Sequence, residues 1–283
     1  MIDVHMHVGR LYMAPPLTPG YLLDFMDSNG IEKAALLPME NPEGTHFYVT
    51  TDEVLSVCAQ HPDRLIAFCN IDPRRWTADL SVDYYGMLCE YREKGCRGFG
   101  EAIAGLCVDD PRAAKIYDGC GRLGMPVTLD MNARSNMDDK GLPRLEGLVR
   151  SLPGTNFIGH AQHFWAEISS DVGEADFDAY PKGRVSPGGA VPRLLTECPN
   201  MYADISAMSG YNALTRDPEY GYRFLEDFQD KLLFGTDLCI VGQEVKIVSY
   251  INDALARRKI SRTAYDKITR KNAEKLLQLR TED

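Results

Sequence analysis

Two histidines separated by one residue end the first apolar segment, as His5 and His7 of Ile2-Asp-Val-His-Met-His-Val. Residues i and i+2 of a strand point to the same face, so both imidazoles are expected to project together. Two imidazoles on one face are suited to binding one zinc ion through nitrogen. The alternative is a pair of core histidines whose hydrogen bonds are satisfied within the protein. The spacing alone leaves both interpretations open.

Further polar side chains end other apolar segments, namely Glu101, Asp130, His160 and Asp237. If the segments are strands of a closed barrel, these side chains meet His5 and His7 at one rim. Imidazoles and carboxylates together are the ligands of a divalent-metal site. Asp204 and Ser206 end another segment, and we expect them to orient their neighbours.

Three of these acids have a simpler alternative. Glu101 is also compatible with a surface charge, although it follows an apolar Gly-Phe-Gly segment. Asp130 is also compatible with an Asx turn that ends a strand. Asp237 is also compatible with a helix N-cap, a role that does not exclude metal binding.

The elements that must position these residues alternate along the chain. Short apolar, β-branched segments predict eight strands, at residues 2–8, 34–39, 65–71, 96–103, 126–131, 156–161, 201–205 and 231–240. Helical periodicity predicts helices at 19–29, 51–60, 77–94, 111–123, 142–151, 190–197, 219–229, 243–258 and 261–278. Asp110-Pro111 is typical of an N-cap followed by proline at the first helical position.

Repeated strand–helix units require a parallel sheet. A doubly wound open sheet is the competing architecture, but the chain has no glycine-rich phosphate fingerprint. We therefore expect one α/β domain over residues 1–283, a single (β/α)8 TIM barrel. The long irregular stretch 166–189 is a candidate lid.

Composition limits the classes of partner. The net charge of −10 argues against nucleic-acid and anionic-membrane surfaces, which need positive charge. No apolar segment approaches the ~18 residues that a membrane span needs. The chain begins without a basic and apolar leader, and its eight cysteines include no Cys-x-x-Cys pair. We expect a cytoplasmic protein with reduced thiols and a small-molecule substrate; a homo-oligomer is compatible with the sequence.

Candidate substrate contacts follow the strand ends. His163 and Trp165 predict an aromatic wall or, equally, a helix packed on the rim. Arg134 and Arg184 are candidate clamps for a substrate carboxylate, with a solvated surface role as the alternative.

Over nearly its whole length, the chain resembles the amidohydrolase-related family (amidohydrolase 2) of the metal-dependent hydrolase superfamily. The resemblance rests on Asp3-Val-His-Met-His, Gly98-Phe-Gly-Glu101, Val108-Asp-Asp-Pro-Arg, Leu123-Gly-Met-Pro-Val, Phe157-Ile-Gly-His160, Tyr202-Ala-Asp-Ile-Ser206 and Leu233-Phe-Gly-Thr-Asp237. It implies a (β/α)8 barrel with one or two divalent ions, commonly zinc.

The resemblance also implies roles for individual residues. His5 and His7 are implied as ligands, His160 as a ligand or substrate contact, and Asp237 as a ligand and proton shuttle. The family usually carries a histidine at the end of strand five, where this chain has Asp130. An aspartate is still a ligand, but its anionic oxygen favours harder ions, so manganese and magnesium stay open beside zinc. Glu101 is a candidate compensating carboxylate.

The predicted function is metal-dependent hydrolysis, in which a metal-bound water attacks the carbonyl of a small amide, ester or lactone. Asp237 would accept the proton of the water, and His160 or His163 would stabilise the developing oxyanion. One alternative is a decarboxylase or hydratase that acts on a small carboxylic acid at the same site. A barrel that binds a ligand without turnover is the third interpretation, supported only by Asp130.

Overall fold

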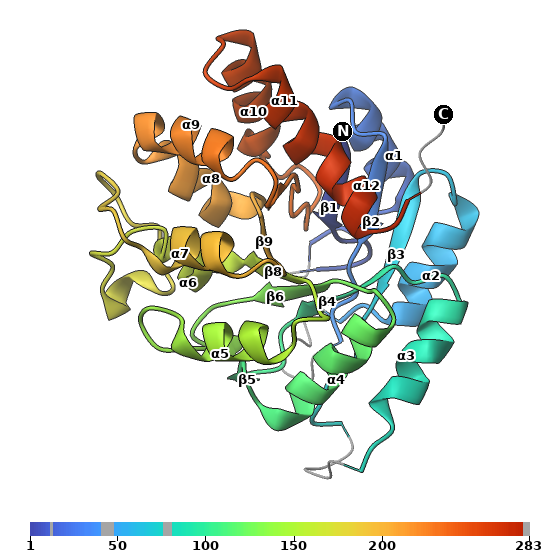
Figure 1. Ribbon diagram of the computed structural model, residues 1–283. Helices are drawn as coiled ribbons and strands as arrows, with labels where there is room; N and C mark the ends of the chain where they lie inside the picture. The colour runs from blue at the N-terminus through green and yellow to red at the C-terminus, as the bar shows by residue number, and fades with distance from the viewer. Residues whose placement is uncertain (12–13, 41–47, 76–80, 280–283) are drawn as a thin grey trace.

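The computed structural model describes residues 1–11, 14–40, 48–75 and 81–279. Eight parallel strands form one sheet in the order β1 (Ile2–Met6), β2 (Lys33–Leu36), β3 (Leu65–Cys69), β4 (Gly98–Ala102), β6 (Val127–Asp130), β8 (Phe157–His160), β9 (Met201–Asp204) and β10 (Leu232–Leu233). Seven of these strands fall inside segments predicted from the sequence, and β2 begins one residue before its predicted segment. The helices follow one another around the ring of strands (Figure 1). The fold is the expected (β/α)8 barrel.

The seam between the first and last strands closes without a long β10. Three backbone hydrogen bonds cross it, from Val4 N to Phe234 O, from His7 N to Leu238 O and from Asp237 N to His5 O. The buried carboxylate of Asp3 also bridges the seam, because its Oδ1 accepts from His5 N at 2.9 Å and from Thr236 N at 3.1 Å. The first strand and the segment after β10 are therefore held together at the level of the site.

The helices expected from periodicity are present with small differences at their ends: α1 (Pro19–Ser28), α2 (Thr51–Gln60), α3 (Tyr84–Glu93), α4 (Pro111–Arg122), α5 (Pro143–Ser151), α7 (Ala190–Glu197), α9 (Pro218–Asp227) and α10 (Lys246–Ala256). Asp110 caps α4 as predicted, with its Oδ1 accepting from Arg112 N at 2.9 Å. The helix predicted at 77–94 begins only at Tyr84, because Asp83 caps it through Gly86 N. Residues 77–80 of that prediction lie outside the described residues.

Three features differ from the sequence prediction. The helix expected at 261–278 is divided into α11 (Arg262–Asp266), the π-helical turn η2 (Lys267–Lys271) and α12 (Asn272–Leu276). Two short helices lie directly after strands, α6 (Ala161–Ala166) and α8 (Ala207–Thr215). The strands β5 (Leu106–Cys107) and β7 (Asn136–Met137) form a separate small parallel sheet.

Candidate metal centre at the carboxyl ends of the strands

The two histidines of the first strand are fixed by hydrogen bonds on one side of each ring. Nδ1 of His5 lies 2.9 Å from Oδ2 of Asp204, and Nδ1 of His7 lies 3.0 Å from the carbonyl oxygen of Leu37. Both side chains are buried, and both Nε2 atoms lack a hydrogen-bond partner. Leaving two buried polar atoms without partners is costly unless something else binds them. The arrangement fits imidazoles whose Nε2 atoms are free to bind a cation.

Two carboxylates face these free nitrogens. Oε2 of Glu101 lies 3.6 Å from Nε2 of His5 and 3.5 Å from Nε2 of His7. Oδ1 of Asp237 lies 3.6 Å and 3.2 Å from the same two atoms. Nitrogen and oxygen donors therefore converge from β1, β4 and the segment after β10. A divalent cation would suit this donor set.

His160, the last residue of β8, points its Nε2 into the same space. That atom lies 3.7 Å from Oε1 of Glu101 and 3.9 Å from Oδ2 of Asp237. Its Nδ1 lies 2.9 Å from Oδ1 of Asp204 and 3.1 Å from the hydroxyl of Ser206. Asp204 thus binds His5 with one oxygen and His160 with the other, as expected of a residue that orients its neighbours.

Donor atoms within 4.8 Å of one another define two overlapping groups among the described residues: His5, Glu101 and His160, and His5, His7 and Asp237. All but Asp237 are buried, and the side chain of Asp237 is 19% exposed. Five of the six predicted ligands therefore meet at one point. Asp130 belongs to neither group.

The ionisable side chains at the rim strongly shift one another's pKa values. Burial alone would lower the pKa of His5, but Glu101 and Asp204 outweigh burial and raise it well above its usual value. The pKa of His160 rises to about 9, because Asp204 outweighs burial and the neighbouring His5. Burial opposes ionisation of Glu101 and Asp237, yet the histidines lower the pKa of both carboxyls. The pKa shifts of His5 and His160 thus arise from the same carboxylates that fix or face these two rings.

Asp130 ends β6 in a different environment. Burial raises the pKa of its carboxyl well above the usual value, and the neighbouring charge of Glu101 raises it further. Its Oδ1 accepts a hydrogen bond from the side chain of Asn132, two residues later. Asn132 also accepts from the backbone nitrogens of Arg134 and Ser135, so the turn after β6 is bonded within itself. Asp130 lies beside Glu101 without reaching the histidine donors.

The predicted substrate contacts occupy three different environments. His163, in α6, is buried and stacks on Phe177 at 3.7 Å between ring centroids, with an Nε2 that lacks a hydrogen-bond partner. Trp165 is only 2% exposed and donates to the carbonyl oxygen of Asp204 at 3.1 Å. Its position matches the helix-packing alternative, behind the centre. The side chains of Arg134 and Arg184 are exposed.

The stretch 166–189, expected as a lid, is bonded to both sides of the barrel rim. Oδ1 of Asp178 accepts from Ala133 N at 2.9 Å in the turn after β6. On the other side, Asn212 of α8 donates to Pro181 O at 3.0 Å, and Asp217 accepts from Val185 N at 3.1 Å. This stretch therefore links the loop that follows Asp130 to the helices that follow β9.

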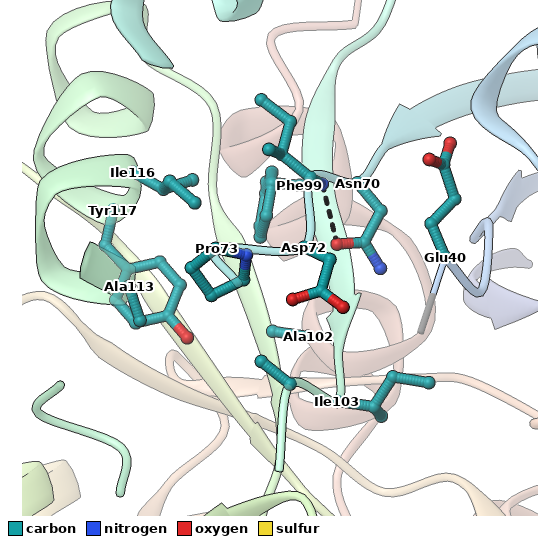
Figure 2. Close-up of a pocket in the computed structure, with 12 residues that line it drawn as sticks. Glu40, Asn70, Asp72, Pro73, Phe99, Ala102, Ile103, Ala113, Ile116 and Tyr117 are labelled. Carbon is teal, nitrogen blue, oxygen red and sulfur yellow. Dashed lines mark hydrogen bonds between the residues drawn. The ribbon is translucent and has the colours of Figure 1, made fainter. Parts of the chain in front are cut away.

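A small cavity of about 10 Å³ is lined by the segment after β3, by Phe99 and Ala102 of β4, and by α4. In the view of Figure 2, Asn70 and Asp72 lie between Glu40 and Tyr117 in its lining. Nδ2 of Asn70 donates to the carbonyl oxygen of Glu101 at 2.7 Å, and Asp72 forms an ion pair with Arg74. Glu40 accepts from Thr51 N at the start of α2. Among these polar groups, Asn70 is the one that holds the backbone of Glu101.

The sequence did not indicate Cys239 or Gln243. Sγ of Cys239 lies 3.1 Å from Oδ1 of Asp237. Burial, followed by the charge of Asp237, raises the pKa of the thiol well above its usual value. Nε2 of Gln243 donates to Asp237 O at 2.7 Å. Their closeness depends on the backbone of Asp237, whose φ of 53° turns the chain back at this point.

Among the described residues, no helix is long and apolar enough to cross a membrane. No curated protein matches the chain. Solved structures match it over almost its full length. One is an amidohydrolase from Burkholderia multivorans with bound zinc, which is 16% identical, with a TM-score of 0.65 and 99% of each chain covered.

Two other solved structures differ in the reaction that their names describe. One is a probable 2-pyrone-4,6-dicarboxylic acid hydrolase from Acinetobacter baumannii (17% identity, TM-score 0.63, 98% of this chain and 99% of that chain covered). The other is a 2,6-dihydroxybenzoate decarboxylase from Rhizobium (18% identity, TM-score 0.60, 98% of both chains covered). At these identities the likeness shows the shared fold. A family model described as Amidohydrolase matches residues 2–279, and the chain therefore belongs to the amidohydrolase family.

Proposed function

We propose that this protein is a metal-dependent hydrolase that cleaves an amide, ester or lactone of a small molecule. One observation carries the proposal: the buried Nε2 atoms of His5 and His7 lack partners, while each Nδ1 is fixed and carboxylates face the free nitrogens. His5, His7, Glu101, His160 and Asp237 would hold the cation. Zinc suits three imidazoles best, and the carboxylates keep manganese and magnesium as candidates.

When bound, a divalent cation supplies Lewis acidity, which polarises a substrate carbonyl and lowers the pKa of the attacking water. The side chains at the barrel rim would transfer the proton and stabilise the developing negative charge. Asp237, whose pKa is lowered and whose Oδ2 is not hydrogen-bonded within the described residues, takes the proton from the water and returns it to the leaving group. His163, whose buried Nε2 lacks a hydrogen-bond partner, or His160 in place of binding the cation, would stabilise negative charge on the carbonyl oxygen. Arg134, exposed in the turn after β6, would contact an acidic substrate.

A lyase reaction on a small carboxylic acid is the second candidate. It is supported by the solved structures of similar fold, one of which is named as a probable hydrolase and another as a decarboxylase. All eight cysteines are free thiols, which supports the proposal that the protein works in the reducing cytoplasm.

The first test is the metal content of protein purified without added metal or chelator. We expect about one or two equivalents of a divalent ion per chain, lost in the double variant His5→Ala, His7→Ala. His61→Ala, at the end of α2, is the matched control and should keep the wild-type content. Protein that stays metal-free after reconstitution contradicts the proposal and favours the interpretation without turnover.

The second test identifies the reaction with a panel of lactones, esters, amides and small aromatic acids. Hydrolysis forms a carboxylic acid product without releasing carbon dioxide, whereas decarboxylation releases carbon dioxide. Asp237→Asn should lower kcat by about 10²–10⁴-fold and keep the ion on the remaining ligands. Unchanged turnover in that variant rules out Asp237 as the proton shuttle.

A further inference from the structure

The thiol of Cys239 lies against a carboxylate of the candidate metal centre. Its Sγ is 3.1 Å from Oδ1 of Asp237 and 3.3 Å from the carbonyl oxygen of the same residue. A thiol has one hydrogen to donate, and an ionised carboxylate is a stronger acceptor than a neutral carbonyl. The hydrogen bond to Oδ1 is therefore the favoured one.

The backbone around Cys239 is held by Gln243. Oε1 of Gln243 accepts from Cys239 N at 2.8 Å and from Ile240 N at 3.2 Å, and its Nε2 donates to Asp237 O at 2.7 Å. Tyr21, in α1, adds a hydrogen bond from Gly242 N at 2.8 Å. The side chain of Cys239 is thus presented to Asp237 by a loop whose own hydrogen bonds are satisfied.

The oxygen that Cys239 contacts is the one closest to the histidine donors. Oδ1 of Asp237 lies 3.2 Å from Nε2 of His7 and 3.6 Å from Nε2 of His5, and neither nitrogen has a hydrogen-bond partner. The second oxygen, Oδ2, lies toward His160 at 3.9 Å. Holding Oδ1 in place therefore sets the rotation of the whole carboxylate.

We propose that Cys239 is a positioning residue, whose thiol holds Oδ1 of Asp237 against the donors of His5 and His7 and leaves Oδ2 to exchange a proton with substrate. This inference rests on the proposed function in one respect, because it requires that the centre binds a divalent ion. Hydrogen-bond partners of metal ligands typically change metal affinity by about 10–100-fold when they are removed.

The test compares Cys239→Ala, which removes the donor, with Cys239→Ser, which keeps one. Cys89→Ala is the matched control, because it removes a half-buried thiol from α3. Each protein is stripped of metal and titrated with cobalt(II) against a competing chelator, and its visible absorption spectrum is recorded. The urea midpoint of each ion-free variant shows whether folding is affected.

We expect cobalt(II) affinity to fall by about tenfold in Cys239→Ala, with a changed visible spectrum and an unchanged urea midpoint. Cys239→Ser should restore the affinity to within about threefold of wild type, and Cys89→Ala should match wild type. Equal affinity and spectra in Cys239→Ala and wild type overturn the inference while leaving the proposed function in place.

Two other results also overturn it. A near-ultraviolet charge-transfer band in wild type that is lost in both Cys239 variants identifies the thiol as a ligand rather than a positioning residue. An affinity in Cys239→Ser as low as in Cys239→Ala shows that a hydrogen bond is not what the position supplies. A wild-type protein that binds no cobalt(II) rejects the proposed function first.

Discussion

The two sides of the candidate centre are built differently. On the side of β1, β8 and β9, each histidine is fixed through Nδ1 by a partner from another strand or loop, and Asp204 serves both His5 and His160. On the side of β6, Asp130 is bonded to Asn132 of its own turn and is raised in pKa by burial and by Glu101. The histidine side chains are thus held by partners from other strands and loops, whereas the carboxylate of Asp130 accepts a hydrogen bond from its own turn.

This difference indicates that the two sides of the centre have different roles. Cross-strand bonds fix the positions of nitrogen donors before any ion arrives, which is what a selective metal site requires. The turn after β6 is instead joined to the 166–189 stretch by a hydrogen bond to Asp178, which is an exposed residue. We infer that the histidine side determines metal binding and that the Asp130 side has more freedom to adapt to substrate.

Of the substitutions that test this difference, Asp204→Asn is expected to have the largest effect. Removing the shared negative charge leaves His5 and His160 without their counter-ion, at a cost of about 3–5 kcal/mol in the unfolding free energy of the ion-free protein. Metal affinity should fall by about 10–100-fold. Urea unfolding and chelator competition measure the two effects. Asp118→Asn, on the exposed face of α4, is the control. Wild-type affinity in Asp204→Asn would mean that the cross-strand bonds do not control the site.

Changing the pH tests the same side without mutation. Folding raises the pKa of His160 from 6.5 to about 9, so the ion-free folded protein keeps a proton that the unfolded chain loses. The stability it contributes is complete below about pH 6.5 and is lost as the pH rises to about 9, by up to about 3 kcal/mol. Urea unfolding in chelator measures it. Metal-loaded protein should not show this loss, because the ion replaces the proton. Equal pH profiles with and without metal would contradict the assignment.

The smallest effect is expected on the other side, for Asp130→Asn. Because Asp130 lies outside both groups of donor atoms, metal affinity should change by less than about threefold, while the KM of a substrate changes more. Chelator competition and steady-state kinetics measure the two quantities. A loss of tenfold or more in metal affinity would place Asp130 among the ligands, as the sequence first suggested, and would remove the contrast between the two sides.

The fold could be predicted because every strand is a short apolar segment and most helices have a cap or a clear period. Two helices were missing from the helices expected from periodicity, although a helix packed on the rim was one of two interpretations of His163 and Trp165, which lie in α6. α6 and α8 begin at Ala161 and Ala207, which have φ values of 75° and 59°, directly after a strand. No side chain caps either helix, and Ser206, the N-cap residue of α8, directs its hydroxyl to Asp204 and His160 instead.

The candidate site was predictable to the extent that strand ends determine it. His5, His7, Glu101, His160 and Asp237 meet because parallel strands present their carboxyl ends at one rim. The partners of these residues follow different rules. His7 is oriented by the backbone carbonyl oxygen of Leu37, and every residue type has such an oxygen, so the partner could not be identified from the sequence. Cys239 reaches Asp237 through a turn of the backbone that spacing does not reveal.

Because the last strand of the barrel is short, a bound metal would also help to close the barrel. β10 has only two residues, and the seam beside it depends on three backbone bonds and the Asp3 bridge. His5 and His7 stand on one side of that seam and Asp237 on the other. A bound ion would therefore hold β1 and the segment after β10 together across the seam.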